Sequence, residues 1–257
     1  MVTDNGKYQI STEFVAGLVR TPLDGPSLRV LHACLHWQSY KLGWREEHVA
    51  APDAAAIWCR VAHLRHRLGL RSRDARTFRR AIAELAQAQL YDHLRLDDGN
   101  ATLHWQFAAG VHRQMLGRAE HYTLLDIACI RECRTTCDLT LYALAAGARG
   151  MDYPLFELDI PALAAACPGA VCAGGFLDWN RARRMLLPAA MRIARMLEAS
   201  LVVQLHERER RPGITDVQVR LRPPGSLWDP KDIVKARPGT RYFTLTREAW
   251  TSGKVGI

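Results

Sequence analysis

The sequence predicts an α+β, helix-rich protein, because one order of helices and hairpins occurs twice along its 257 residues. In the first half, two helical patterns precede an arginine-rich helix over 72–90 and two alternating segments around the turn DDGN. In the second half, two helical patterns precede a basic helix over 178–200 and an alternating hairpin over 201–223. The order helix, helix, basic helix, hairpin is typical of a winged helix, so we expect two tandem winged-helix domains.

These patterns set the expected domain boundaries. We place an N-terminal winged-helix domain at 1–118, a C-terminal winged-helix DNA-binding domain at 119–224 and a C-terminal tail at 225–257. The segment RYFTLTREAW is the only strong pattern in the tail, and it predicts a strand with a helical turn. The tail is expected to pack on either domain or to stay loose.

The helices of the first half are predicted from apolar spacing and from their end signals. Residues 28–42 form a leucine stripe that Gly43 ends. Residues 53–68 repeat apolar positions at helical steps, beginning at Ile57, and Gly69 ends them. Ser72 is a good N-cap for the arginine-rich helix, which is held by Phe78, Ile82 and Leu85.

The helices of the second half are predicted in the same way. Asp159 caps a helix with Pro161 in its first turn, and Asp178 caps the basic helix. Leu186, Ala190, Ile193 and Leu197 form the buried stripe of that basic helix. Pro188 lies inside it and is expected to bend the helix, with a break at Leu187 as the alternative.

The positive charge is concentrated in two places. Lys and Arg outnumber Asp and Glu by 35 to 26, which gives a net charge of +9. Residues 60–80 hold eight arginines and one acid, and residues 181–222 hold ten arginines and four acids. A pI near 9.5 makes double-stranded DNA the first partner to consider. An arginine- and alanine-rich composition without a binding role is the alternative.

Each basic helix offers side chains for DNA. In a helix-turn-helix the second helix enters the major groove, where Arg reads guanine and Asn reads adenine. The basic hairpin tip suits phosphate or minor-groove contact, although Glu207 and Glu209 also allow a wing with internal ion pairs. We expect Arg181 and Arg184 to read bases. The full predicted DNA-binding set is Arg73, Arg76, Arg79, Arg80, Asn180, Arg181, Arg183, Arg184, Arg208, Arg210 and Arg211.

Other chemistry receives little support. Cys129, Cys133 and Cys137 fall at steps of four on one expected helix face, but three thiols with that spacing lack the fourth ligand of a structural zinc site. The sequence has no phosphate loop for ATP and no membrane-length apolar run. We therefore expect no enzymatic activity, no cofactor, no metal and no membrane partner. Seven cysteines without a regular framework predict a reduced cytoplasmic compartment.

The second half resembles theta-type plasmid replication initiators, which are built from two winged-helix domains and bind repeated origin sequences. The resemblance is strongest over 121–222. Its marks are the pair Leu141-Tyr142, the acidic strand-to-helix connection before the second helix, the step Leu187-Pro188-Ala189, and the basic hairpin that follows. The first half fits only in architecture, and the loop 43–52 and the insert GAVCAGG at 169–175 depart from the pattern.

The resemblance implies a location on nucleoid or plasmid DNA and a division of labour between the two domains. The C-terminal domain would read most bases, and the N-terminal domain would contact DNA and also form a homodimer or bind host helicase-loading proteins. Two other interpretations stay open. One is a winged-helix transcriptional repressor that uses the same parts. The other is an N-terminal domain that serves chiefly as a dimerisation or helicase-loader module, with arginines that only raise solubility.

Overall fold

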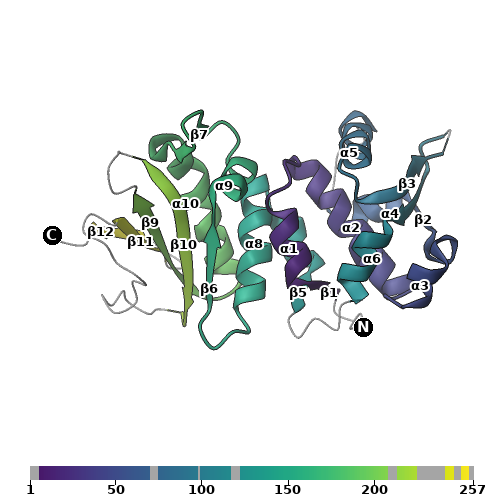
Figure 1. The fold of residues 1–257 in the computed structure, drawn as a ribbon, viewed down its shortest axis with the longest axis horizontal. Coiled ribbons are helices and arrows are strands. Elements are labelled where there is room, and N and C mark those ends of the chain that lie inside the picture. Colours follow the sequence, from purple (N-terminus) through teal and green to yellow (C-terminus); the bar gives the residue numbers. More distant parts are fainter. Residues whose placement is uncertain are drawn as a thin grey trace. The chain divides into compact units, whose positions relative to one another are not determined.

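The computed structural model describes residues 6–69, 75–97, 99–116, 122–207, 213–224, 241–245 and 250–254. Within these ranges the chain is α+β and rich in helix (Figure 1). Its contacts divide it into two compact units. Unit 1 comprises Met1–Leu18 and Leu23–Arg134, and unit 2 comprises Val19–Pro22 and Thr135–Ile257.

Unit 1 is built from short helices around two small sheets. Its elements in chain order are β1 (Lys7–Ser11), α1 (Thr12–Leu18), α2 (Gly25–Lys41), α3 (Glu47–Ala50), the 3-10 turn η1 (Pro52–Ala55), β2 (Ile57–Arg60), α4 (Val61–Arg67), α5 (Ala75–Gln87), β3 (Tyr91–Leu96), β4 (Thr102–Phe107), α6 (Ala109–Leu116), β5 (Tyr122–Asp126) and α7 (Ile127–Glu132).

A three-stranded antiparallel sheet in the order β2-β4-β3 forms one wall of the core of unit 1. The central strand β4 alternates strictly, with Leu103, Trp105 and Phe107 fully buried and the residues between them partly exposed. Leu31 on α2 and Leu85 on α5 are also fully buried. Because α2 packs against both α4 and α5, the sheet and these three helices share one apolar core.

The helix predicted over 53–68 is wrong in its first part. The chain instead forms η1, then strand β2, and begins α4 only at Val61. Ile57 and Cys59 are buried while Trp58 and Arg60 are exposed, which is the two-residue alternation of a strand. β2 pairs with β4, with Ile57 opposite Trp105. Tertiary pairing therefore overrides the helical spacing of four apolar residues in this segment.

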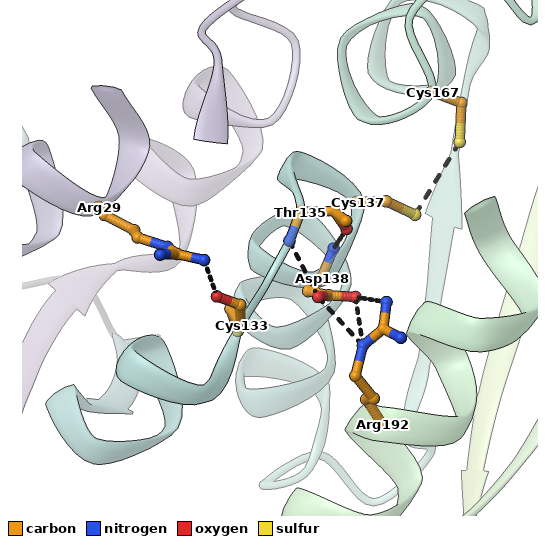
Figure 2. A network of polar contacts seen from close by, with 7 residues as sticks. All are labelled: Arg29, Cys133, Thr135, Cys137, Asp138, Cys167 and Arg192. Carbon is orange, nitrogen blue, oxygen red and sulfur yellow. Dashed lines mark hydrogen bonds and ion pairs between the residues drawn. The ribbon is translucent and has the colours of Figure 1, made fainter. Parts of the chain in front are cut away.

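The end of unit 1 lies beyond the boundary expected from the sequence. β5 pairs antiparallel with β1, with Leu125 opposite Tyr8, and α7 packs against α2. The guanidinium of Arg29 on α2 donates a hydrogen bond to the carbonyl oxygen of Cys133, just after α7 (Figure 2). These contacts keep β5 and α7 with unit 1, so the two units divide at Arg134 and Thr135 rather than at residue 118.

Unit 2 contains one larger sheet with helices packed on it. Its elements in chain order are α8 (Thr136–Ala148), β6 (Leu155–Leu158), α9 (Ile160–Ala166), β7 (Val171–Cys172), β8 (Phe176–Leu177), α10 (Trp179–Met196), β9 (Ser200–Glu207), β10 (Ile214–Arg222), β11 (Arg241–Leu245) and β12 (Trp250–Lys254).

The sheet of unit 2 is antiparallel and centred on the β9–β10 hairpin. β10 pairs with β9 on one side, and with β6 and β8 on the other. β11 pairs with β9, and β12 pairs with β11. The C-terminal segment therefore adds two strands to this sheet, where the sequence predicted one strand of undetermined placement. The insert at 169–175 contains β7, which pairs with β8 directly after the insert.

Both units use the same order of elements. Apart from α3 and η1, the order in unit 1 is α2, β2, α4, α5 and the β3–β4 hairpin. Apart from β7 and β8, the order in unit 2 is α8, β6, α9, α10 and the β9–β10 hairpin. In each unit the short strand after the first helix pairs with the second strand of the hairpin. The repeated order seen in the sequence is present in the structure, with this additional strand in each unit.

Two of the buried histidines of unit 1 lie on helix α2. His32 and His36 lie one turn apart on α2, each with about 1% of its surface exposed. Nδ1 of His32 lies 2.6 Å from the hydroxyl of Tyr8, and Nδ1 of His36 lies 3.2 Å from Nη1 of Arg67. Burial lowers the pKa of His32 to about 4, and burial together with the Arg67 charge lowers the pKa of His36 to about 4.

We therefore expect unit 1 to lose stability in mild acid. Each histidine is neutral in the folded protein and has a lower pKa there than the ordinary 6.5 of the unfolded chain. Their stabilising effect is complete above pH 6.5 and is lost as pH falls toward 4, because the unfolded chain binds the protons more readily. Urea unfolding at several pH values should show the midpoint falling across this window.

A double variant, His32→Gln with His36→Gln, is the control for this prediction. Glutamine keeps an acceptor near Tyr8 but does not titrate, so the variant should show a flatter dependence over the same window. The part that stays includes His112, whose pKa is also lowered by burial. An unfolding midpoint of the unmodified protein that is constant between pH 6.5 and 4 would contradict the assignment.

Candidate nucleic-acid interface

Helix α10 begins at a side-chain cap that the sequence predicted. The carboxylate of Asp178 accepts hydrogen bonds from the backbone N–H groups of Asn180, at 2.9 Å, and Arg181, at 3.3 Å. The cap satisfies N–H groups of the first turn that have no helical acceptor. It therefore fixes where the basic first turns of α10 start.

The basic side chains of α10 share one face. At 100° per residue, Asn180, Arg181, Arg183 and Arg184 fall within an arc of about 160°. All four residues are exposed. Ala182, Leu186, Ala189 and Ile193 are buried on the opposite face. The buried stripe thus holds the helix to unit 2 and directs the predicted DNA-binding residues to solvent.

The four residues differ in their contacts within the chain. Arg181 forms an ion pair with Asp178, with Nε 3.3 Å from Oδ2, and also donates to the carbonyl of Gly169. Among the residues that the structure describes, Arg183 and Arg184 have neither a hydrogen-bond nor an ion-pair partner. Of the two expected base readers, Arg184 is therefore unengaged and Arg181 is partly engaged.

A buried ion pair fixes α10 against α8. Nη2 of Arg192 lies 2.6 Å from Oδ1 of Asp138, and Nε lies 3.1 Å from both carboxylate oxygens (Figure 2). Asp138 has no exposed surface, whereas the side chain of Arg192 is 25% exposed. Asp138 also completes a capping box with Thr135 at the start of α8. One carboxylate thus orders the first turn of α8 and the middle of α10.

Pro188 lies within α10 without ending it, so the alternative of a break at Leu187 is wrong. Proline has no N–H, so the carbonyl of Arg184 lacks its usual donor four residues later. Leu187 and Ala189 on either side are buried, and Arg192 is anchored one turn further on. The packing on both sides of Pro188 therefore keeps the helix continuous.

Helix α5 of unit 1 presents a second set of arginines. Arg76, Arg79 and Arg80 are exposed, while Phe78, Ala81, Ile82 and Leu85 are buried. Arg79 donates to the side chain of Asn100 at 3.1 Å. Arg80 forms an ion pair with Asp24 at 2.9 Å, and Asp24 also caps α2. Arg79 and Arg80 are therefore engaged within unit 1, although the Arg80 side chain stays 68% exposed.

Several predicted contacts fall outside the described residues. Arg73 precedes α5, and Arg208, Arg210 and Arg211 follow β9, all in segments that the structure does not describe. The proposed N-cap Ser72 lies in the same undescribed segment as Arg73. These positions stay predictions from the sequence.

One basic residue on the outward face of α10 was missed by the sequence reasoning. Arg195 is exposed and lies eleven residues after Arg184, which is three helical turns along the same face. The i+11 spacing is visible in the sequence. The sequence prediction covers only the first turns of the helix, because base contacts are usual there.

The three cysteines considered for zinc do not share one helix. Cys129 lies on α7, Cys133 is its C-cap and Cys137 lies on α8, because the chain leaves the helical path between Cys133 and Thr135. Sγ of Cys137 instead lies 3.9 Å from Sγ of Cys167 in the core of unit 2 (Figure 2). No group of three or more metal-binding side chains occurs among the described residues.

A search of the described helices finds none with the length and apolarity needed to cross a membrane.

The fold was compared with solved structures. The fold is similar to that of the Pi initiator protein. Its crystal structure, in complex with iteron DNA, matches with a TM-score of 0.61 over 88% of this chain and 100% of that chain, at 14% sequence identity. The resemblance to plasmid replication initiators inferred from the sequence is thus confirmed for the fold.

No protein-family model and no curated protein sequence matches the chain. At this sequence distance the structural likeness establishes the fold alone.

The Arg192–Asp138 pair predicts an unequal response to two identical substitutions. Arg192→Met leaves the carboxylate of Asp138 buried without its cation, so the free energy of unfolding should fall by about 3 kcal/mol. Arg20→Met removes the partner of Asp159 from a pair whose side chains are 48% and 37% exposed, so its effect should stay under about 1 kcal/mol. Urea unfolding followed by fluorescence compares the two, and equal losses would contradict the role given to Asp138.

Proposed function

We propose that this chain is a sequence-specific, double-stranded DNA-binding protein that acts as a plasmid replication initiator at repeated origin sites. The observation that carries the proposal is the outward face of α10, where Arg183 and Arg184 are exposed and have no partner among the described residues. The likeness of the fold to an initiator solved with iteron DNA supports the choice of target.

The element order supports the assignment of each unit as a winged helix. A winged helix consists of two helices that lead to a recognition helix, followed by a hairpin, and the recognition helix enters the major groove. We assign α5 of unit 1 and α10 of unit 2 as the recognition helices. The β3–β4 and β9–β10 hairpins are then the wings.

The two units are proposed to contribute unequally. Arg183 and Arg184 on α10 can each form two hydrogen bonds with guanine O6 and N7 without breaking a contact within the chain. Arg79 and Arg80 on α5 must first exchange Asn100 and Asp24 for DNA. Exposed pairs of this kind are weak, so the exchange costs little, but it favours phosphate contact over base reading in unit 1.

The contacts within unit 1 also support a second role for that unit. Because two of its recognition-helix arginines already have partners, a homodimer or helicase-loader contact is the alternative proposal for unit 1. A variant with Arg76, Arg79 and Arg80 all changed to alanine distinguishes phosphate contact from the interaction role. The measurement is its affinity for duplex DNA. Unchanged affinity would favour the interaction role, and a loss shared by all sequences would favour phosphate contact.

The function is tested by footprinting on the DNA that flanks the gene for this chain. We expect protection of several directly repeated sites next to an AT-rich segment. A single inverted repeat over a promoter would instead indicate a transcriptional repressor that uses the same helices. An absence of any protected site would overturn the proposal.

Variants of α10 test the residues. Arg183→Ala and Arg184→Ala should each weaken binding to the repeat by about 1–3 kcal/mol and relax the sequence preference at one position. Arg149→Ala is the matched control, because Arg149 is an exposed arginine of unit 2 outside the proposed interface. Fluorescence anisotropy with specific and scrambled duplexes measures both effects, and equal losses for Arg149 and Arg184 would argue against base reading.

Binding is also expected to depend steeply on salt. With about six to ten phosphate contacts, affinity should fall by ~10³ or more between 50 and 200 mM salt, since each contact releases counterions from the DNA. The anisotropy titrations repeated over this range report the slope. An affinity that does not change would contradict binding through the arginine-rich surfaces.

A further inference from the structure

Unit 1 contains a cavity that the proposed duplex contacts do not use. It has a volume of about 580 Å³ and lies between the C-terminal end of α2, strand β2 and the start of α4. Trp37, Lys41, Trp58, Arg60 and His63 are among the residues that line it. The volume is in the range of small-molecule sites, which is about 300–1,000 Å³.

Trp58 gives this cavity an exposed aromatic wall. Its side chain is 60% exposed, which is unusual for so large an apolar group. The strand places Trp58 on the outer face of the sheet, opposite His104 on β4, which in turn lies opposite Arg95 on β3. Among the described residues, no ring or cation stacks on the Trp58 indole. One flat ring is therefore available to a ligand.

The other charged and aromatic groups here make the cavity positive. Lys41 lies over the rings of Trp37 and Tyr40, at 5.1 and 5.3 Å, and Arg67 lies over the same two rings, at 4.9 and 5.5 Å. Arg60 is exposed at the cavity edge, and no Asp or Glu is among the described residues that line it. A ligand with a flat ring and a negative charge fits this combination.

The positive charges of Arg67 and Lys41 also act on Cys59, a buried residue beside the cavity. Burial raises the pKa of the Cys59 thiol to about 11, and the positive charges of Arg67 and Lys41 oppose that rise. Cys59 also lines the cavity, on the same strand as Trp58. The positive potential therefore extends over the cavity and favours an anion there.

We propose that this cavity binds one nucleotide unit, with its base stacked on Trp58 and its phosphate held by Lys41 and Arg60. Every base has a π face, so stacking on an exposed indole is tolerant of sequence, and the cations match the phosphate. The unit has two possible sources, an unpaired nucleotide of a DNA strand or a free mononucleotide. The site lies outside the two proposed recognition helices, so it adds a function to that of a duplex binder.

The test measures three ligands on the full chain. Anisotropy reports binding of a labelled single strand of about ten nucleotides, calorimetry reports binding of deoxyadenosine monophosphate, and the repeat duplex serves as reference. Trp58→Ala should weaken nucleotide binding about tenfold or more, since one stacked base contributes about 1–3 kcal/mol. It should leave duplex affinity unchanged. Binding of both ligands, or of the monophosphate alone, identifies a free mononucleotide as a ligand, and binding of the strand alone identifies unpaired DNA.

The control variant is Tyr122→Ala, which removes another exposed aromatic side chain of unit 1 away from the cavity. It should leave nucleotide binding unchanged. Failure of both nucleotide ligands to bind, or equal binding by the Trp58→Ala variant and the unmodified chain, would overturn the proposal. So would a Trp58-dependent preference for a glutamate-rich peptide with one phenylalanine over either nucleotide.

This test is independent of the proposed duplex function. Arg183→Ala with Arg184→Ala should abolish repeat binding and leave the Trp58-dependent binding of the single strand or monophosphate in place. A chain that lacks duplex affinity but keeps that dependence would refute the initiator proposal alone.

Discussion

Asp138 is a carboxylate with no exposed surface, and the orientation of α10 depends on how its charge is satisfied. The backbone N–H of Thr135 and the guanidinium of Arg192 donate to it, and it belongs to the capping box of α8. A buried charge of this kind is costly unless it is paired and hydrogen-bonded. Its main effect is to fix one position of α10 against α8, because another register would leave the carboxylate unpaired.

Ion pairs with acidic side chains distinguish arginines with structural roles from arginines that are available to a ligand. Arg192 holds the helix, Arg181 is tied to its cap, and Arg80 is tied to the cap of α2. Arg183 and Arg184 lie on the outward face of α10 without such ties in the described part of the chain. The number of positive charges in the sequence does not make this distinction. It depends on which arginines lie within ion-pair distance of an Asp or Glu side chain.

The sequence predicted the features that depend on local chemistry. Asp159 and Asp178 were recognised as N-caps, and both accept backbone hydrogen bonds at the start of their helices. The buried face of α10 followed from a 3.6-residue period, and the structure buries the same residues. These features could be predicted because a cap or a helix face is decided within a few residues.

Features that depend on contacts between residues far apart in the sequence could not be predicted from local patterns. Ile57 shows helical spacing with Val61, yet it forms a strand because β2 pairs with β4. Strand β1 pairs with β5, which lies more than one hundred residues later in the sequence. The Asp138–Arg192 pair joins two helices through residues that no local pattern connects. The exposure of Trp58 could not be predicted either, because it follows from the pairing of β2 with β4, which turns this side chain to the outer face of the sheet.

The most direct test of the central claim is guanine methylation interference on the repeat, with the unmodified chain and the Arg184→Ala variant. If α10 lies in the major groove with Arg184 on a guanine, N7 methylation of that guanine blocks binding of the unmodified chain. The variant should lose this sensitivity at that guanine and keep it at the others. Binding that tolerates methylation at every guanine but is blocked by phosphate ethylation would contradict the account, because it would show backbone contact without base reading.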